Sequence, residues 1–285
     1  MSGIFQRLAR SVSISRKVAA VRPLALLAVG CLALTASSAT TLRGETITFA
    51  AASSDRSAQA VFSLNGQVLE ITLSNTHSAG DGFQLTPTDV LAGLFFDIAG
   101  APTLTAVKAT LASQSILVLD GEDITASETA SQPFGTGDVG AAWAYYSGAI
   151  SGLTQQFALT AVGFGVVGPN SLFHPGSKLA HQQGAAPNGD DYGLIPSLTT
   201  DFSQGNLSKR AFIQSSAMFT LTGLVGSLDD IGNVRFQYGS SLSSPYLEAT
   251  PEPSTWTLMI VGMVALAAHA GRNVRRHRRA GKSTF

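Results

Sequence analysis

The sequence has almost no cysteine and carries little charge. Cys31 is the only cysteine among 285 residues, so the chain can form no internal disulfide. Charged residues make up 13% of the chain and hydrophobic residues 45%. A chain with this composition can bury enough apolar surface to fold or to associate with a membrane, so the composition argues against intrinsic disorder.

The middle of the chain is also poor in basic residues. Six of the 18 basic residues lie at or before Arg43, and six more lie at or after Arg272. Between Glu45 and Glu248 there are 17 acidic residues against six basic ones, a net charge of −11. A segment this acidic repels phosphate backbones, so we expect no nucleic-acid partner. The same charge would attract divalent cations.

The middle lacks the motifs of the common catalytic classes. There is no G-x-S-x-G sequence, and Cys31 lies outside this part of the chain. The segment 135–140 fits G-x-G-x-x-G, but no strand signal precedes it and no helix signal follows it, so we interpret it as a glycine-rich turn. We therefore predict a protein that is not an enzyme. The alternative is a glycan-active enzyme with two carboxylates facing each other across a cleft.

The N-terminal segment has the order of a secretion signal. Five basic residues and no acidic ones occupy the first 22 positions, the run 23–34 is apolar, and small residues follow at 36–39. This order predicts a signal peptide over residues 1–39, which signal peptidase would remove. The alternatives are a lipoprotein cysteine at Cys31 and a retained anchor, although a 12-residue run is short for a membrane span.

The C-terminal segment combines a short motif, an apolar run and a basic cluster. The motif is Pro251-Glu252-Pro253, whose two prolines favour an extended backbone. Residues 256–270 are apolar apart from Thr257 and His269, which predicts a membrane helix. A basic stop at 272–279 would then stay on the cytoplasmic side; its members are Arg272, Arg275, Arg276, Arg278 and Arg279.

This order of motif, span and basic cluster over residues 251–280 resembles the PEP-CTERM sorting signal of Gram-negative bacteria. The resemblance implies that an exosortase, a membrane-embedded transpeptidase-like enzyme, recognises the tail and removes it. It also implies an association with exopolysaccharide and biofilm. We therefore expect an exported precursor held in the inner membrane and then delivered to the cell surface or the extracellular matrix. An ordinary C-terminal anchor is the alternative.

Residues 40–250 have a hydrophobic period near two, and we predict an exported all-β domain. Asn65-Gly66 predicts a hairpin turn, no amphipathic helical run of 12 residues occurs, and 172–198 is expected to be a long loop. Many short strands with glycine-rich turns predict a β-sandwich or a jelly-roll-like fold, flanked by the signal helix and the membrane helix. The expected strands are 46–49, 60–64, 67–73, 90–98, 103–111, 115–119, 142–147, 156–167, 211–222 and 234–238.

Two sets of residues in the middle are candidates for metal binding. Asp120, Glu122 and Asp123 gather the oxygen ligands that calcium prefers, without the spacing of an EF-hand loop. A second metal hypothesis uses the long loop, with His174, His181, Asp190 and Asp191. Solvated turn and loop residues are the alternative for both sets. No other cofactor is expected.

One aromatic pair is a candidate for binding sugars. Trp143 and Tyr145 would share one side of a strand, and aromatic faces stack on the apolar faces of sugar rings. This pair makes a polysaccharide-binding module the alternative function. Aromatic residues on strands also belong to hydrophobic cores, which is the competing interpretation.

Overall fold

The structure is a computed structural model, and it describes residues 44–80, 83–182, 187, 189–197 and 207–251. Every described residue belongs to one compact unit, which lies within Leu42–Phe285. The predicted signal peptide, membrane helix and basic stop lie outside the described residues. Within the described ranges, no helix is long and apolar enough to cross a membrane.

The described residues fold mostly as β-strands, which confirms the all-β prediction at the level of fold class. The α-helix α1 (Thr125–Thr129) and three short 3₁₀ turns, η1 (Pro87–Asp89), η2 (Pro169–Ser171) and η3 (Leu228–Asp230), complete the described elements. The strands are β1 (Glu45–Ala52), β2 (Ser57–Asn65), β3 (Val68–Asn75), β4 (Leu91–Ile98), β5 (Thr105–Leu111), β6 (Ile116–Leu119), β7 (Glu122–Asp123), β8 (Ala144–Ser147), β9 (Phe157–Thr160), β10 (Leu194–Ile195), β11 (Ala211–Gln214), β12 (Ser216–Thr222), β13 (Ile231–Tyr238) and β14 (Tyr246–Pro251).

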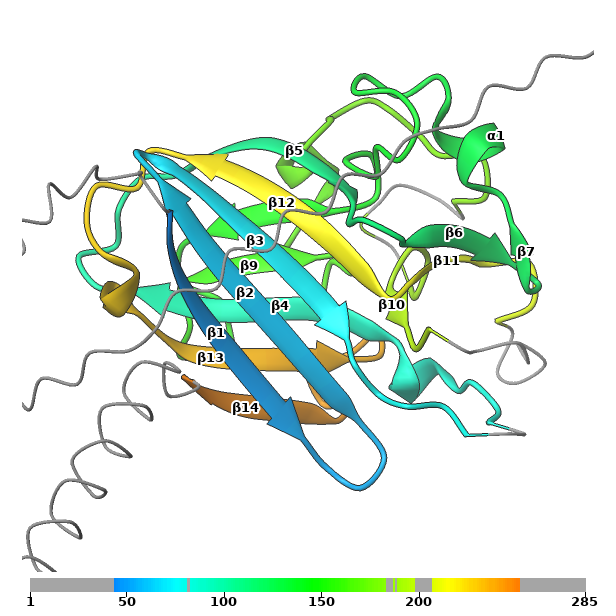
Figure 1. The fold of residues 1–285 in the computed structure, drawn as a ribbon, viewed down its shortest axis with the longest axis horizontal. Coiled ribbons are helices and arrows are strands. Elements are labelled where there is room, and N and C mark those ends of the chain that lie inside the picture. The colour runs from blue at the N-terminus through cyan, green and yellow to red at the C-terminus, as the bar shows by residue number, and fades with distance from the viewer. Residues whose placement is uncertain (1–43, 81–82, 183–186, 188, 198–206, 252–285) are drawn as a thin grey trace, which may run out of the picture. The chain divides into compact units, whose positions relative to one another are not determined.

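These strands form one continuous, curled sheet (Figure 1). The hydrogen-bonded order is β5-β12-β3-β2-β1-β14-β13-β4-β10-β11-β6-β7, and β9 joins β4 and carries β8. Among the described strands, every pair is antiparallel except β10 with β11. Strand β14 links the two parts of the sheet, because residues 246–249 pair with β13 whereas residues 250–251 pair with β1.

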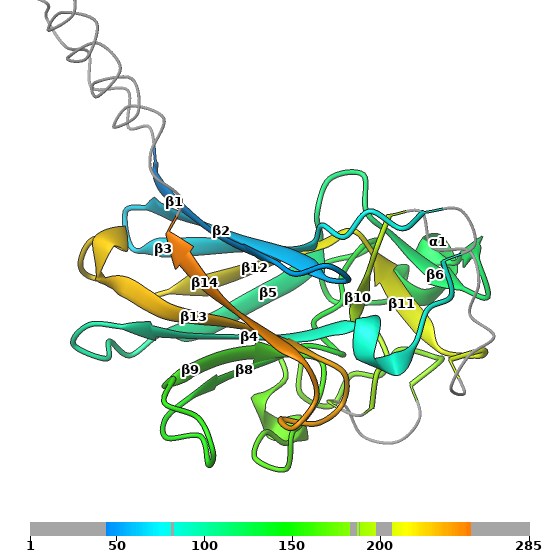
Figure 2. The same cartoon turned by 90° about the horizontal axis from the view of Figure 1, so that it is seen from below.

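The curled sheet packs its apolar side chains against its own opposite part. Phe62 of β2 meets Phe96 of β4 with ring centroids 5.4 Å apart, although these strands are not neighbours in the sheet. Phe49 and Phe157 extend this contact at centroid distances of 5.6 and 5.5 Å. Figure 2 shows β1, β2 and β3 lying across from β13, β4 and β9. Burial of these large side chains is the main stabilising contribution to the domain.

The predicted hairpin of β2 and β3 is present, but its turn is shifted by one residue. Asn65 pairs with Val68, so the two turn residues are Gly66 and Gln67 rather than Asn65 and Gly66. Gly66 has a φ of 64°, and Gln67 has no positive φ. A positive φ at the first turn residue alone is the pattern of a type II′ turn, which places glycine first.

Other predicted strand boundaries are wrong where non-glycine residues adopt positive φ angles. The predicted strand 156–167 is a strand only over β9, and Phe164 has a φ of 49° beyond its end. The predicted strand 211–222 is two strands, β11 and β12, divided at Ser215 with a φ of 84°. The sequence prediction also missed β7, β10 and β14, and β10 lies inside the predicted long loop 172–198.

Candidate functional site

The first residue of the predicted sorting motif ends the last described strand. Pro251 closes β14, is exposed to solvent, and lies opposite Phe49 of β1. Proline has no backbone N–H and is therefore tolerated at a strand end. Glu252 and Pro253 lie outside the described residues. The motif thus begins within the strand that completes the sheet.

Trp143 is a core residue, which contradicts its predicted role as a sugar platform. Its side chain is 0% exposed, and its ring lies 4.9 Å from that of Phe219 on β12. Its indole Nε1 donates a hydrogen bond to the backbone oxygen of Tyr192 at 3.1 Å. A ring without exposed surface cannot stack on a sugar, so the core interpretation is the correct one for this residue.

Tyr145 lies on β8 and is half-buried against the main hydrophobic core. Burial raises the pKa of its hydroxyl to about 12. Trp143 precedes β8, so the two aromatic residues do not form the exposed strand face that the sequence suggested.

The carboxylates of the predicted calcium site are used in local turns. Asp120 has a φ of 50°, and its Oδ1 accepts a hydrogen bond from the backbone N–H of Lys209 at 3.2 Å. Asp123 Oδ1 accepts from the N–H of Thr125, at the start of α1, at 2.9 Å. Glu122 is exposed on β7. In the part of the chain that the structure describes, no three His, Cys, Asp or Glu side chains gather as metal ligands, and calcium binding stays a prediction.

A buried carboxylate that sequence reasoning missed connects α1 to the predicted long loop. Glu128 is 6% exposed, and its Oε1 lies 2.7 Å from Nδ1 of His181. Its Oε2 accepts hydrogen bonds from the Tyr192 hydroxyl and from the N–H of Ala180, both at 2.9 Å. We call these four residues the Glu128 network. Burial, and then the neighbouring Glu128 carboxylate, raise the pKa of Tyr192 far above its ordinary value.

The Glu128 network resembles an acid–base site in one respect, since a carboxylate orients a histidine. Its contacts nevertheless join distant parts of the chain, because Glu128 links Ala180, His181 and Tyr192 to α1 across 52 to 64 positions of sequence. We therefore interpret Glu128 as a structural residue that holds Ala180, His181 and Tyr192 against α1.

A second buried carboxylate–histidine pair joins His174 of the predicted long loop to Asp138. Asp138 is 0% exposed and accepts hydrogen bonds from the N–H groups of Phe134 and Gly140, and its Oδ1 lies 3.2 Å from His174 Nδ1. The two hydrogen bonds from Phe134 and Gly140 to Asp138 hold the 135–140 segment as a turn, in agreement with its interpretation as a glycine-rich turn. Because His174 and His181 are held by different carboxylates, the fold does not assemble the second predicted metal site.

A third cluster of buried charged side chains involves the two residues Asp190 and Asp191, which lie shortly before β10 in the sequence. Asp191 Oδ2 lies 3.1 Å from the guanidinium of Arg210, and Asp190 is buried beside them. Burial raises the pKa of Asp190, the charge of Asp191 raises it further, and Arg210 opposes both effects. Asp190 and Asp191 thus belong to an ion-pair group distinct from both histidines.

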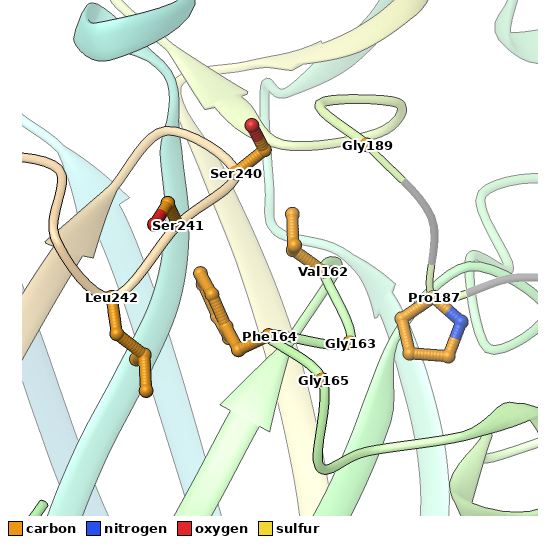
Figure 3. A pocket seen from close by; sticks show the side chains of 9 residues that line it. All are labelled: Val162, Gly163, Phe164, Gly165, Pro187, Gly189, Ser240, Ser241 and Leu242. Carbon is orange, nitrogen blue, oxygen red and sulfur yellow. The ribbon is translucent and has the colours of Figure 1, made fainter. Parts of the chain in front are cut away.

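The described residues also line a pocket of about 400 Å³ (Figure 3). Phe164, which packs against Phe95 at a centroid distance of 5.6 Å, stands on one wall, and the serines of the β13–β14 connection stand on another. None of the described lining residues carries a charge. The lining residues are Val162, Gly163, Phe164, Gly165, Pro187, Gly189, Ser240, Ser241 and Leu242.

Comparisons with known proteins find no relative of this chain. No protein-family model, no curated protein and no solved structure matches it. The fold therefore defines the class of this protein as a β-rich domain, and its function has to be argued from its own residues.

Proposed function

We propose that this chain is a non-enzymatic surface or extracellular-matrix protein that is exported and then sorted by an exosortase. The observation that carries the proposal is the sequence order of three parts at the C-terminus. These are Pro251-Glu252-Pro253, the apolar run 256–270 and the arginines of 272–279. The basic, apolar and small-residue order of positions 1–39 supports export through the inner membrane, with signal peptidase as the first processing enzyme.

The β domain suits this route in two ways. Its net charge of −11 between Glu45 and Glu248 favours solubility outside the cell. Its last strand brings Pro251 to the surface, where a processing enzyme could reach the motif. We further propose that the curled sheet is a β-sandwich or jelly roll, on the basis of the contact between Phe62 and Phe96 across non-neighbouring strands.

Replacement of Pro251, Glu252 and Pro253 by alanine tests the sorting proposal. The full chain is expressed in its producing cell, and the mass of the C-terminal tail is followed by mass spectrometry. We expect the variant to keep its tail and to stay in the membrane fraction, because the recognition motif is lost. Glu248→Ala, an exposed change on the same strand, serves as the control and should be processed normally. Unchanged processing of the triple variant would refute exosortase sorting.

A second candidate function is binding of a neutral polysaccharide, and the pocket of Figure 3 favours it. The described part of the lining combines serine hydroxyls, glycine backbone and the ring of Phe164, and none of its side chains is charged. Sugars present hydroxyls and apolar ring faces together, and a volume of about 400 Å³ lies in the usual range of small-ligand sites. We therefore propose this pocket, rather than Trp143 and Tyr145, as the candidate sugar-binding site.

Phe164→Leu is expected to weaken binding of exopolysaccharide fragments by roughly three- to tenfold, because it keeps apolar bulk and removes the flat ring face. Binding is measured by calorimetry on the full chain. Val225→Ala, an exposed residue that does not line the pocket, is the control. If neutral fragments bind equally well to both variants, or do not bind to the unaltered protein, this pocket is not a glycan site.

A further inference from the structure

Two polar side chains of β13 lie on the face of the sheet that carries the pocket. In the pairing of β13 with β4, Gln237 lies opposite Gly93, and a Cβ atom at Gly93 would lie 3.2 Å from the ring of Phe164. Opposite residues of an antiparallel pair direct their side chains to the same face, so Gln237 and Phe164 share one face of the sheet. Arg235 precedes Gln237 by two positions and therefore lies on this face as well.

The side-chain amide of Gln237 is buried under the connection between β13 and β14. Gln237 is 0% exposed, and its Oε1 accepts hydrogen bonds from the Arg235 guanidinium at 2.6 and 3.2 Å. Because Arg235 can only donate, these two bonds fix the orientation of the amide. Its Nε2 donates at 3.0 to 3.2 Å to four backbone oxygens, which share its two hydrogens. These oxygens belong to Tyr238, Ser241, Ser244 and Pro245.

The same hydrogen bonds position one wall of the pocket. The β13–β14 connection supplies Ser240, Ser241 and Leu242 to the lining. Gln237 binds the backbone oxygen of Ser241 at 3.0 Å, and Arg235 donates to the backbone oxygen of Leu242 at 3.3 Å. Two side chains outside the described lining thus attach this wall to the sheet.

We propose that Gln237 is a positioning residue for glycan binding, because its buried amide holds the wall of Ser240, Ser241 and Leu242 in place. Arg235 orients the amide and acts through Gln237. The effect on binding rests on the proposed glycan function of the pocket, whereas the attachment of the connection to the sheet does not.

Gln237→Glu tests this proposal, because it keeps the shape of the side chain and replaces the amide nitrogen by an oxygen. A carboxylate cannot donate a hydrogen bond, so the four backbone oxygens would lose their donor. We expect this variant to bind neutral exopolysaccharide fragments roughly tenfold more weakly in calorimetry on the full chain. Gln67→Glu makes the same change at an exposed position of the β2–β3 turn and should leave the affinity unchanged.

A background that lacks the serine hydroxyls separates positioning from a general loss of stability. In a protein with Ser240→Ala and Ser241→Ala, the wall has already lost its hydroxyl contacts to the sugar. Residues that act through one network have non-additive effects, so Gln237→Glu should then weaken binding by less than roughly threefold. A full tenfold loss in this background would overturn the proposal, because Gln237 would not act through the serine wall.

Hydrogen exchange by mass spectrometry on the purified full chain in detergent reports the attachment of the connection independently. Gln237→Glu should exchange roughly tenfold faster in peptides that cover 239–245, with unchanged far-ultraviolet circular dichroism. If this variant does not fold, Arg235→Lys replaces it, since lysine lacks the fork that binds the amide oxygen twice.

The outcomes distinguish the proposal from the function on which it rests. Unchanged exchange of 239–245, or unchanged affinity of the variant for a fragment that the unaltered protein binds, would overturn the role of Gln237 alone. Absence of binding to the unaltered protein would refute the glycan function of the pocket and the binding role of Gln237 with it. The exchange comparison would still decide whether Gln237 holds the connection.

Discussion

Replacing Glu128 by alanine is expected to lower the free energy of unfolding by about 3 kcal/mol, because it leaves buried polar groups without their partner. The carboxylate of this residue accepts hydrogen bonds from the Tyr192 hydroxyl and the Ala180 N–H, and it contacts the His181 ring. Tyr192 is 0% exposed, so its hydroxyl has no ready access to water after the change. The predicted consequence is a loop that detaches from α1 before the sheet itself unfolds.

Urea unfolding followed by circular dichroism measures this cost, and hydrogen exchange of residues 174–182 locates it. Glu128→Gln keeps the shape and one acceptor, so we expect it to cost about 1 kcal/mol. Glu70→Ala removes an exposed acid of β3 and is the matched control, with an expected change within about 0.5 kcal/mol. A Glu128→Ala protein as stable as the Glu70→Ala protein would show that the Glu128 network does not hold the long loop.

Replacing Trp143 by alanine is expected to destabilise the domain by about 4 kcal/mol, the largest single effect we predict. The side chain is fully buried, its ring packs against Phe219, and its indole N–H is bonded to Tyr192. The substitution therefore removes a large apolar volume and leaves the backbone oxygen of Tyr192 without its donor.

Trp143→Phe separates these two contributions, because it retains most of the ring and loses only the donor. We expect a cost of about 1–2 kcal/mol for this variant in the same urea titration. If Trp143→Ala left stability unchanged and instead lowered sugar binding, the residue would be a surface platform and the core assignment would be wrong.

The all-β fold class could be predicted from the sequence because its cause, the alternation of buried and exposed side chains along each strand, is local. In β2, buried Ala58, Ala60 and Phe62 alternate with more exposed residues, and this period-two pattern is visible in the sequence. The breaks at Phe164 and Ser215 were not predictable, since positive φ angles at non-glycine residues depend on tertiary contacts rather than on a local sequence signal. Strands as short as β7 and β10 are too brief to show a period.

The candidate sites were harder to predict, because their partners are distant in the sequence. Glu128 meets His181 and Tyr192 across 53 and 64 positions, and no spacing rule links them. Tryptophan occurs both in hydrophobic cores and on sugar-binding platforms, and only the burial of Trp143 decides between these two roles. The proposed sorting motif is different, since it is a contiguous segment and can be read directly from the sequence.

The intact mass of the protein recovered from the cell surface tests the central claim most directly. The proposed sorting predicts a mature chain that begins near residue 40 and lacks residues 256–285, because signal peptidase and exosortase have removed the two ends. A surface protein that still contains the arginine cluster of 272–279 would contradict exosortase sorting.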